Sequence, residues 1–276
     1  MSHSITGKTK ILGVIGYPVT YSLSPVMHNR ALAHLGLDYV YVALPVPIDR
    51  FSVAIQGLFA CESVMGFNLT IPHKQEILPH LVEISPIAQT VGAVNTVKRS
   101  AEGWIGTNTD VEGFIYPLHN RRLTKAVILG TGGAAKAVIV GCQKLGIKNI
   151  TVVGRSEDKL QLLQQQFAVN ICPWLELSQV IENSDLVVNC TPIGMDNHSP
   201  LTDTQIAALA AQTIVYDLIY TPRPTPLLQL AQARGLTTID GLEMLLYQGA
   251  LALTYWLEVS PPIAVMAEAL GIPYKS

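Results

Sequence analysis

Short apolar runs and amphipathic helical patterns alternate along the chain. The apolar runs predict strands at residues 10–17, 39–46, 126–129, 149–155, 185–192 and 213–220. Helical patterns occupy residues 24–36, 48–60, 241–257 and 261–271. Such alternation predicts an α/β protein with mostly parallel sheets. The near-continuous apolar character of the later runs is typical of strands that are buried on both faces.

Local signals mark the ends of several elements. Ser24 is predicted to cap the helix that Pro25 begins and Gly36 follows. Asp49 is predicted to cap the next helix. Residues 92–108 predict a β-hairpin, with its turn at Glu102-Gly103.

The segment NLTIPHK, residues 68–74, combines a strand end with polar side chains. Asn68 and Thr70 share one face of the predicted strand, because side chains alternate with a period of two. Pro72 cannot donate a hydrogen bond to a sheet, so the strand ends before it. An amide, a hydroxyl and the ammonium of Lys74 are thereby placed together.

The pattern changes near Asp110, where we expect a domain boundary. The prediction is a first domain of residues 1–112, to which residues 243–276 return, and a dinucleotide-binding domain of residues 113–242. The second domain contains the segment GTGGAAKA between a strand and a helix. Gly130, Gly132 and Ala135 form a G-x-G-x-x-A pattern there. In a βαβ unit this pattern favours a pyrophosphate at the helix N-terminus, although small residues also permit a tight turn without a ligand.

The end of the next strand indicates which dinucleotide would bind. NAD-binding folds usually place Asp or Glu there to accept from the ribose 2′-hydroxyl. Here the sequence is Gly154-Arg155-Ser156, followed by Lys159. These side chains suit a 2′-phosphate. The alternative is a solvated, charged turn that starts a helix.

Composition excludes several classes of protein. Charged residues make up 14% of the chain, against roughly 25% in an average soluble protein, and hydrophobic residues make up 49%. Even so, Gln248, Thr254 and Glu258 interrupt the most apolar stretch, so no transmembrane helix is predicted. The net charge of −2 and the lack of a basic stripe indicate neither nucleic acid nor a membrane surface as partner. We expect a soluble, cytoplasmic protein.

The four cysteines lack metal-ligand spacing. Cys61, Cys142, Cys172 and Cys190 are scattered among apolar or small residues. They are interpreted as reduced, packed thiols. No metal site is predicted.

Several motifs, in order, resemble the shikimate dehydrogenase family over essentially the whole length. They are GYPVTYSLSPVMHN, NLTIPHK, GAVNT, GTNTDVEG, GTGGAAKA, NCTPIGM, LIYTPRPTPLL and GLEMLLYQGA. The resemblance implies an N-terminal α/β substrate domain, a Rossmann-type domain and C-terminal helices that return to the first domain. It also implies NADP as cofactor, shikimate and 3-dehydroshikimate as small-molecule substrates, and a homodimer or monomer.

The resemblance assigns roles residue by residue. Lys74 and Asp110 match the catalytic pair. Ser22 and Ser24 match the residues that bind the substrate carboxylate. The residues implied for the ring hydroxyls are Asn68, Thr70, Asn95 and Gln248, with Tyr220 closing the site. The residues implied for the cofactor are Gly130, Thr131, Gly132, Gly133, Ala134, Gly154, Arg155, Ser156, Lys159, Thr191, Leu218 and Gly241.

Judged singly, several of these residues have ordinary structural explanations. Lys74 would be a solvated lysine, Asp110 a helix cap, Asn95 a turn residue and Gln248 a helix-surface amide. Only their combination favours the catalytic interpretation.

Three positions depart from the family's pattern. Gly154-Arg155-Ser156 stands where Asn-Arg-Thr is usual, Lys136 replaces an arginine, and Leu218 replaces a common methionine. None of them involves Lys74 or Asp110, so they affect cofactor preference more than reaction type. The alternatives are a quinate/shikimate enzyme that uses NAD, or a non-catalytic, ligand-binding regulator.

Overall fold

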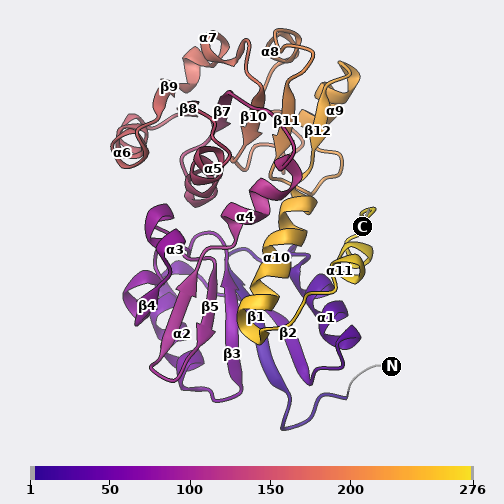
Figure 1. Cartoon of the computed structure of the whole chain (residues 1–276). Coiled ribbons are helices and arrows are strands. Elements are labelled where there is room, and N and C mark those ends of the chain that lie inside the picture. The colour runs from indigo at the N-terminus through magenta and orange to yellow at the C-terminus, as the bar shows by residue number, and fades with distance from the viewer. Residues whose placement is uncertain (1–3, 275–276) are drawn as a thin grey trace. The chain divides into compact units, whose positions relative to one another are not determined.

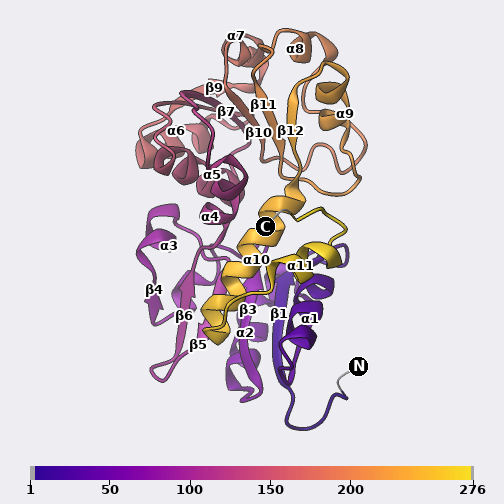
Figure 2. The same cartoon turned by 45° about the vertical axis from the view of Figure 1, so that its right-hand side comes forward.

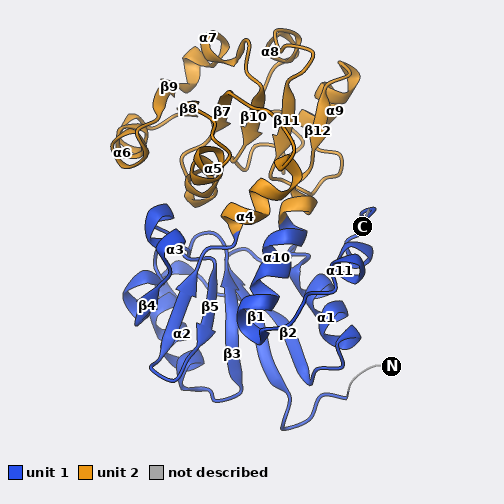
Figure 3. Cartoon of the chain, in the orientation of Figure 1, with its two compact units in different colours: residues 1–109, 245–276 blue, residues 110–244 orange. Residues whose placement is uncertain are grey.

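The computed structural model describes residues 4–274. These residues form two compact units (Figure 3), one made of residues 1–109 with 245–276 and the other of residues 110–244. The sequence analysis placed the corresponding boundaries at 112/113 and 242/243.

The first unit contains a mixed six-stranded sheet. Its strands are β1 (Lys10–Gly16), β2 (Tyr39–Pro45), β3 (Val64–Leu69), β4 (Glu83–Ile84), β5 (Thr96–Arg99) and β6 (Trp104–Thr107). The strand order is β2-β1-β3-β5-β6-β4. β1 pairs in parallel with β2 and β3, whereas β5 is antiparallel to both β3 and β6. The antiparallel pairing of β5 with β6 confirms the predicted hairpin.

Helices cover both faces of this sheet. They are α1 (Ser24–His34), α2 (Phe51–Ala60), α3 (Pro86–Val91), α11 (Ile263–Ala269) and the C-terminal part of α10 (Gly241–Leu257). α2 packs through Phe51 and Ile55 on the core side of β3. On the other face, the Trp256 ring of α10 lies 2.5 Å from where a Cβ on Gly66 would stand, so the helix reaches β3 only because residue 66 is glycine.

The last two helices return to the first unit, as predicted. α11 lies beside α1 in both views (Figures 1 and 2). Gly249 of α10 contacts α1 closely, since a Cβ there would collide with Cε of Met27. The helices therefore complete the apolar cover of the N-terminal sheet.

The second unit contains a wholly parallel sheet. Its strands are β7 (Lys125–Leu129), β8 (Asn149–Gly154), β9 (Asn170–Pro173), β10 (Leu186–Asn189), β11 (Ile214–Asp217) and β12 (Thr237–Ile239). The order β12-β11-β10-β7-β8-β9 is that of a doubly wound dinucleotide-binding fold. Along the chain, the strands are added outward on one side from β7 to β9 and then outward on the other side from β10 to β12. The switch point therefore lies between β7 and β10, and such folds bind ligands in the crevice outside the carboxyl ends of these two strands.

Helices also cover both faces of the parallel sheet. They are α4 (Asp110–Ile115), α5 (Gly133–Lys144), α6 (Glu157–Phe167), α7 (Leu177–Ile181), α8 (Asp203–Ala207) and α9 (Pro226–Ala233). Side chains of α7, α8 and α9 share one core cluster with Val127, Val187 and Val215. α4 packs against α5, where Gly141 leaves room for the Phe114 ring.

Both predicted caps in the first unit are wrong. Ser24 is the first residue of α1 and Leu23 is its N-cap, because the Ser22 hydroxyl oxygen already accepts from the Ser24 N–H over 3.3 Å. Asp49 lies in a 3₁₀ turn, Ile48–Arg50, and α2 starts after it without a side-chain cap. The prediction of packed cysteines fails at Cys61, which is exposed just past the end of α2.

Candidate functional site

Asn68 lies next to the end of β3 and is almost completely buried. Its Oδ1 accepts from the Tyr41 hydroxyl at 2.7 Å. Its Nδ2 donates to the Asn95 carbonyl at 3.2 Å and to Oγ1 of Thr96 at 3.0 Å. Both N–H groups of the Asn68 amide therefore donate to other protein atoms. Asn68 can bind a substrate hydroxyl only as an acceptor, through the second lone pair of Oδ1.

Asn95 is the centre of the same polar network. Its Oδ1 accepts from the Thr109 N–H at 2.8 Å and from the Thr96 hydroxyl at 2.9 Å. Its Nδ2 donates to Oγ1 of Thr109 at 3.0 Å and to Oε1 of Gln248 at 3.4 Å. The contact with Gln248 is the longest of these, so it is the one that a ligand hydroxyl would displace most easily.

Gln248 is a buried residue of α10 rather than a surface amide. Only 8% of it is exposed, and its Nε2 donates to the Leu245 carbonyl at 2.9 Å. Asn68, Asn95 and Gln248, which are distant in sequence, thus converge on one network. Thr70 follows β3 directly and lies over Gly16, where a Cβ would collide with Cγ2 of Thr70.

Lys74 lies half-buried in the turn after β3. Its carbonyl accepts from the N–H of Val94 at 2.8 Å, which ties the turn to the residue before Asn95. The preceding His73 is fully buried, stacks on Phe51 with ring centroids 4.3 Å apart, and contacts the Val46 carbonyl through Nε2 at 2.6 Å. Burial lowers the pKa of His73, so the neutral ring donates to that carbonyl and anchors the turn that carries Lys74.

The predicted carboxylate-binding serines lie at the start of α1. Ser22 precedes the helix and is half-buried, while Ser24 is buried. The Ser22 oxygen accepts from the Ser24 backbone, which leaves the Ser22 hydroxyl proton able to donate to an anion.

Asp110 and Tyr220 belong to the second unit. Asp110 is the first residue of α4 and is 5% exposed. A carboxylate in the first turn of a helix is favoured by the helix dipole. Tyr220 lies half-buried in the loop between β11 and α9.

The glycine-rich turn joins β7 to α5 in a form suited to a pyrophosphate. Gly130 has a φ of +113°, which favours glycine, and a Cβ there would stand 3.1–3.2 Å from atoms of Thr191 and Cys190. Gly132 is the N-cap of α5, no side chain caps this helix, and a Cβ on Gly132 would meet nothing within 4 Å. The backbone N–H groups of the first turn, from Gly133 and Ala134 onward, therefore fit an approaching anion.

The predicted 2′-phosphate residues follow β8. Arg155 and Lys159 are exposed, and Ser156 is the N-cap of α6, its oxygen accepting from the Lys159 N–H at 3.4 Å. The helix-starting alternative and the phosphate role are thus compatible, because the Ser156 hydroxyl can still donate. Gly154 has a packing reason to be glycine, since a Cβ would stand 2.6 Å from Cγ2 of Thr131.

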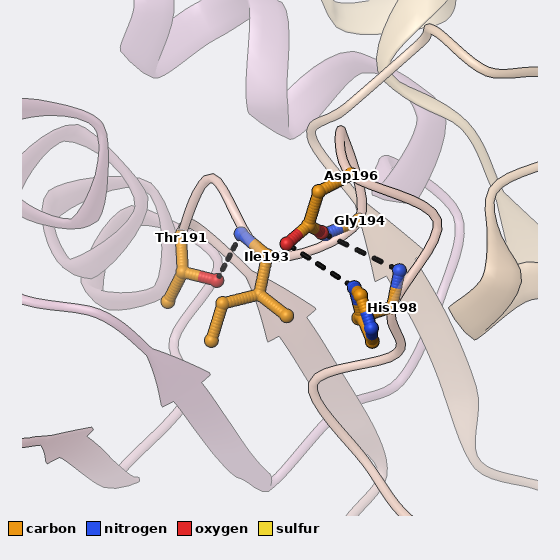
Figure 4. A network of polar contacts seen from close by, with 5 residues as sticks. All are labelled: Thr191, Ile193, Gly194, Asp196 and His198. Atoms are coloured by element: carbon orange, nitrogen blue, oxygen red, sulfur yellow. Dashed lines mark hydrogen bonds and ion pairs between the residues drawn. The ribbon is translucent and has the colours of Figure 1, made fainter.

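Thr191 shapes the turn after β10 (Figure 4). Its Oγ1 accepts from the Ile193 N–H at 3.2 Å. Further along the turn, the exposed Asp196 accepts from the Gly194 and His198 N–H groups, at 3.4 Å each, and pairs with the His198 ring at 3.2 Å. Gly241 allows the backbone of Leu218 to approach, because a Cβ there would collide with the Leu218 carbonyl oxygen.

Residues 4–274 hold no group of three or more His, Cys, Asp or Glu side chains that could bind a metal ion. In the same part of the chain, none of the helices combines the length and the apolar character needed to cross a lipid bilayer.

Known proteins match this chain over nearly its whole length. Residues 14–97 match the shikimate dehydrogenase substrate binding domain, residues 118–243 match shikimate/quinate 5-dehydrogenase, and residues 241–270 match the shikimate 5′-dehydrogenase C-terminal domain. A Synechocystis relative, "Shikimate dehydrogenase (NADP(+))", is 52% identical over 97% of each chain. The chain belongs to the shikimate dehydrogenase family.

Solved structures of similar proteins include two cofactor types. Shikimate 5-dehydrogenase from Thermus thermophilus, in complex with NADP(H) and shikimate, has a TM-score of 0.84 and 34% identity over 95% of this chain and 98% of its own. Quinate dehydrogenase from Corynebacterium glutamicum, in complex with NAD, has a TM-score of 0.86 and 30% identity over 95% and 98%. These neighbours confirm the predicted fold class.

Sequence reasoning missed the buried residues that support the site. They are Tyr41, His73, Thr109, Asn189 and Asp217. Tyr41, Asn189 and Asp217 lie in apolar runs that predict buried strands, whereas His73 and Thr109 lie in polar stretches. A polar residue at the last position of a buried strand, as at Asn189 and Asp217, was the one available signal.

Proposed function

We propose that this protein catalyses the reversible, NADPH-dependent reduction of 3-dehydroshikimate to shikimate in aromatic amino acid biosynthesis. The observation that carries the proposal is the 52% identity to a curated shikimate dehydrogenase over 97% of both chains. The substrate-side and the cofactor-side motifs both fall within that match.

The first unit is proposed to bind the substrate. Ser22 and Ser24 donate to its carboxylate. The residues that hold the ring hydroxyls are Asn68, Thr70, Asn95 and Gln248. A polyhydroxylated ring acid needs such fixed partners, since a buried polar group left unpaired costs roughly 1–3 kcal/mol. The rigid network around Asn95 supports this role, because its amide is already oriented before a ligand arrives.

The second unit is proposed to bind NADP. The glycine turn holds the pyrophosphate, and Arg155, Ser156 and Lys159 hold the 2′-phosphate. The cofactor supplies hydride chemistry when bound. Thr191, Leu218 and Gly241 shape the wall where the nicotinamide is expected.

Lys74 and Asp110 are proposed as the catalytic pair. We assign to Lys74 the transfer of the alcohol proton and to Asp110 the orientation of Lys74 and a share in the proton.

Two other functions fit the same fold. The similarity to an NAD-bound quinate dehydrogenase, together with Gly154, favours a quinate/shikimate enzyme that uses NAD as the second candidate. The third is a ligand-binding regulator without catalysis. The presence of both Lys74 and Asp110 argues against that third candidate, because a sensor needs neither.

We further propose that the protein works in the cytoplasm as a homodimer. The absence of cysteine pairs among the described residues agrees with a reducing compartment. Sedimentation of the purified protein across a concentration series would measure the oligomeric state.

Initial rates with each combination of shikimate or quinate and NADP or NAD test the proposal. We expect the highest kcat/KM with shikimate and NADP. Faster turnover of quinate with NAD would favour the second candidate. Binding of shikimate without turnover of any pair would favour the third.

A further inference from the structure

Two buried polar residues face each other on neighbouring strands of the second unit. Asn189 of β10 is in register with Asp217 of β11, and its Nδ2 donates to Oδ1 of Asp217 at 2.9 Å. Both residues are 0% exposed. Each is the last residue of its strand, so the pair lies at the edge of the sheet where ligands are expected in this fold.

Asn189 shapes the turn that carries Thr191. Its Oδ1 accepts from the Thr191 N–H at 3.0 Å and from the Thr191 hydroxyl at 2.7 Å. Its Nδ2 also donates to the Ile193 carbonyl at 3.0 Å, and its own carbonyl accepts from the Leu218 N–H at 3.1 Å. The Asn189 side chain thus fixes the conformation of the turn after β10. The Asn189 carbonyl holds Leu218, the first residue after β11.

Asp217 holds both ends of the loop that carries Tyr220. Its carboxylate accepts from the Ile219 N–H at 3.1 Å and from the Thr225 hydroxyl at 2.6 Å. Asn189, Ile219 and Thr225 thus all donate hydrogen bonds to this carboxylate. A carboxylate accepts at every lone pair, whereas an amide would turn an NH₂ group toward one of the donors. These donors therefore favour Asp over Asn at this position, although burial outweighs them and raises the pKa of the Asp217 carboxyl to about 6.

Position within the fold also favours the charge. Thr225 is the N-cap of α9, so the carboxylate lies beside the positive end of that helix dipole. Above about pH 6 the second unit therefore holds a buried charge, and these hydrogen bonds replace part of the water that the carboxylate loses.

We propose that Asn189 and Asp217 are a pair of positioning residues for the dehydrogenase reaction. Through their hydrogen bonds they position Thr191 and Leu218 for contact with the cofactor. They also position Tyr220 for contact with the substrate. Because both side chains are buried under their own loops, they act through these residues and not by touching a ligand. This inference rests on the proposed function.

The test compares two threonines that both cap helices. Thr225→Val loses the cap of α9 and the bond to Asp217, whereas Thr202→Val loses only the cap of α8. Both variants should melt at a lower temperature. Only Thr225→Val should weaken NADPH binding, measured by nicotinamide fluorescence without turnover, by up to about ten-fold, because the hydrogen bond to Asp217 that it removes positions the loops and does not contact the cofactor.

Hydrogen exchange and a rescue variant complete the test. Thr225→Val should speed amide exchange at residues 190–195 and 218–225, and Thr225→Ser, which keeps the hydroxyl, should restore wild-type behaviour. If Thr225→Val does not fold, Asp217→Asn replaces it, because it keeps the shape and removes one acceptor. A lower melting temperature with unchanged NADPH affinity and unchanged exchange would overturn the proposal. Wild-type protein that binds NADPH without oxidising shikimate would overturn the proposed function instead, and the binding and exchange comparison would still decide the role of the pair.

Discussion

The Tyr41 hydroxyl donates to Oδ1 of Asn68 over 2.7 Å, and this contact decides which way the Asn68 amide points. With Oδ1 held by Tyr41, the NH₂ group must face Asn95 and Thr96. The Tyr41 ring is itself held by stacking on His28, with centroids 4.4 Å apart. A strand-end amide of β3 is thereby oriented by a side chain of β2, which lies two strands away in the sheet.

Removal of the Tyr41 hydroxyl should therefore weaken the binding of substrate but not the binding of cofactor. Tyr41→Phe keeps the ring stack but leaves Oδ1 of Asn68 short of a donor, which should lower the free energy of unfolding by about 1–3 kcal/mol. We also expect a higher KM for shikimate and an unchanged KM for NADP. Urea unfolding and steady-state rates measure both effects, with Tyr39→Phe, at the start of the same strand, as the matched control. A change confined to stability would mean that the Asn68 amide does not matter for binding.

Loss of the Lys74 ammonium should lower the rate without unfolding the protein. Lys74→Ala is expected to reduce kcat by about 10²–10⁴, the usual range for a lost general acid–base. The fold should survive because His73, and not Lys74, anchors the turn through its buried ring. Lys148→Ala, at an exposed lysine, is the control. If Lys74→Ala kept more than half of the wild-type kcat, the assignment of proton transfer to Lys74 would be wrong.

The serines at the start of α1 should affect KM more than kcat. Binding of the substrate carboxylate persists from the ground state to the transition state, so its loss weakens both equally. Ser22→Ala and Ser24→Ala should each raise the KM for shikimate. Because Ser24 does not cap α1, its replacement should not carry the cap cost of about 0.5–2 kcal/mol. Unchanged KM values in both variants would place the carboxylate elsewhere.

Alternation of apolar runs and helical patterns was enough to predict the fold class, since each buried strand must be covered by a neighbouring element. The hairpin at Glu102-Gly103 was also confirmed, because its turn chemistry is local. The cap at Ser24 failed because Ser22 accepts from the first N–H of α1, and the cap at Asp49 failed because this residue lies in a 3₁₀ turn before α2. The supporting contacts of Asn95 could not be predicted, because Gln248 lies 153 residues away.

Stability should fall with rising pH through the titration of Asp217. Burial is the largest cause that raises its pKa, from 3.8 to about 6, and Asp240 adds to it, while hydrogen bonds from Thr225, Ile219 and Asn189 oppose the rise. Because the folded pKa lies above the unfolded value, the stabilisation is fully present below about pH 4 and is lost as the pH rises through about 6. The shift corresponds to about 3 kcal/mol at most.

Urea unfolding between pH 4 and pH 7 measures this effect as a difference between wild type and Asp217→Asn. The free energy of unfolding of the wild type, relative to that of the variant, should fall from pH 4 to pH 7, because the variant has no carboxyl at this position. Asp196→Asn is the control whose difference from wild type should stay nearly constant over this range, since backbone hydrogen bonds and His198 lower the pKa of Asp196 and so place its titration below pH 4. Parallel curves for wild type and Asp217→Asn would show that Asp217 does not titrate in this range.

Cofactor choice should depend on Arg155 and on the packing of Thr131 against Gly154. Arg155 presents a planar fork to phosphate oxygens, and a hydrogen bond to a charged group is worth about 1.5–3 kcal/mol. Arg155→Ala should therefore cut kcat/KM for NADP by about ten-fold or more and leave NAD use nearly unchanged. Equal damage with both cofactors, or wild-type use of NAD as well as NADP, would show that Arg155 does not read the 2′-phosphate.

The Thr131 methyl explains why an extra side chain cannot simply be added at residue 154. Gly154→Asn would press its Cβ to within 2.6 Å of Cγ2 of Thr131, and overpacking of this kind costs about 1–3 kcal/mol. Thr131→Ala removes that methyl, so the double variant should recover the lost stability and gain an amide beside Arg155. We expect the double variant to prefer NADP more strongly than the wild type does. Urea unfolding and kcat/KM with both cofactors, measured for the two single variants and the double, give the coupling between the sites. Additive effects of the two changes would mean that Thr131 does not limit residue 154.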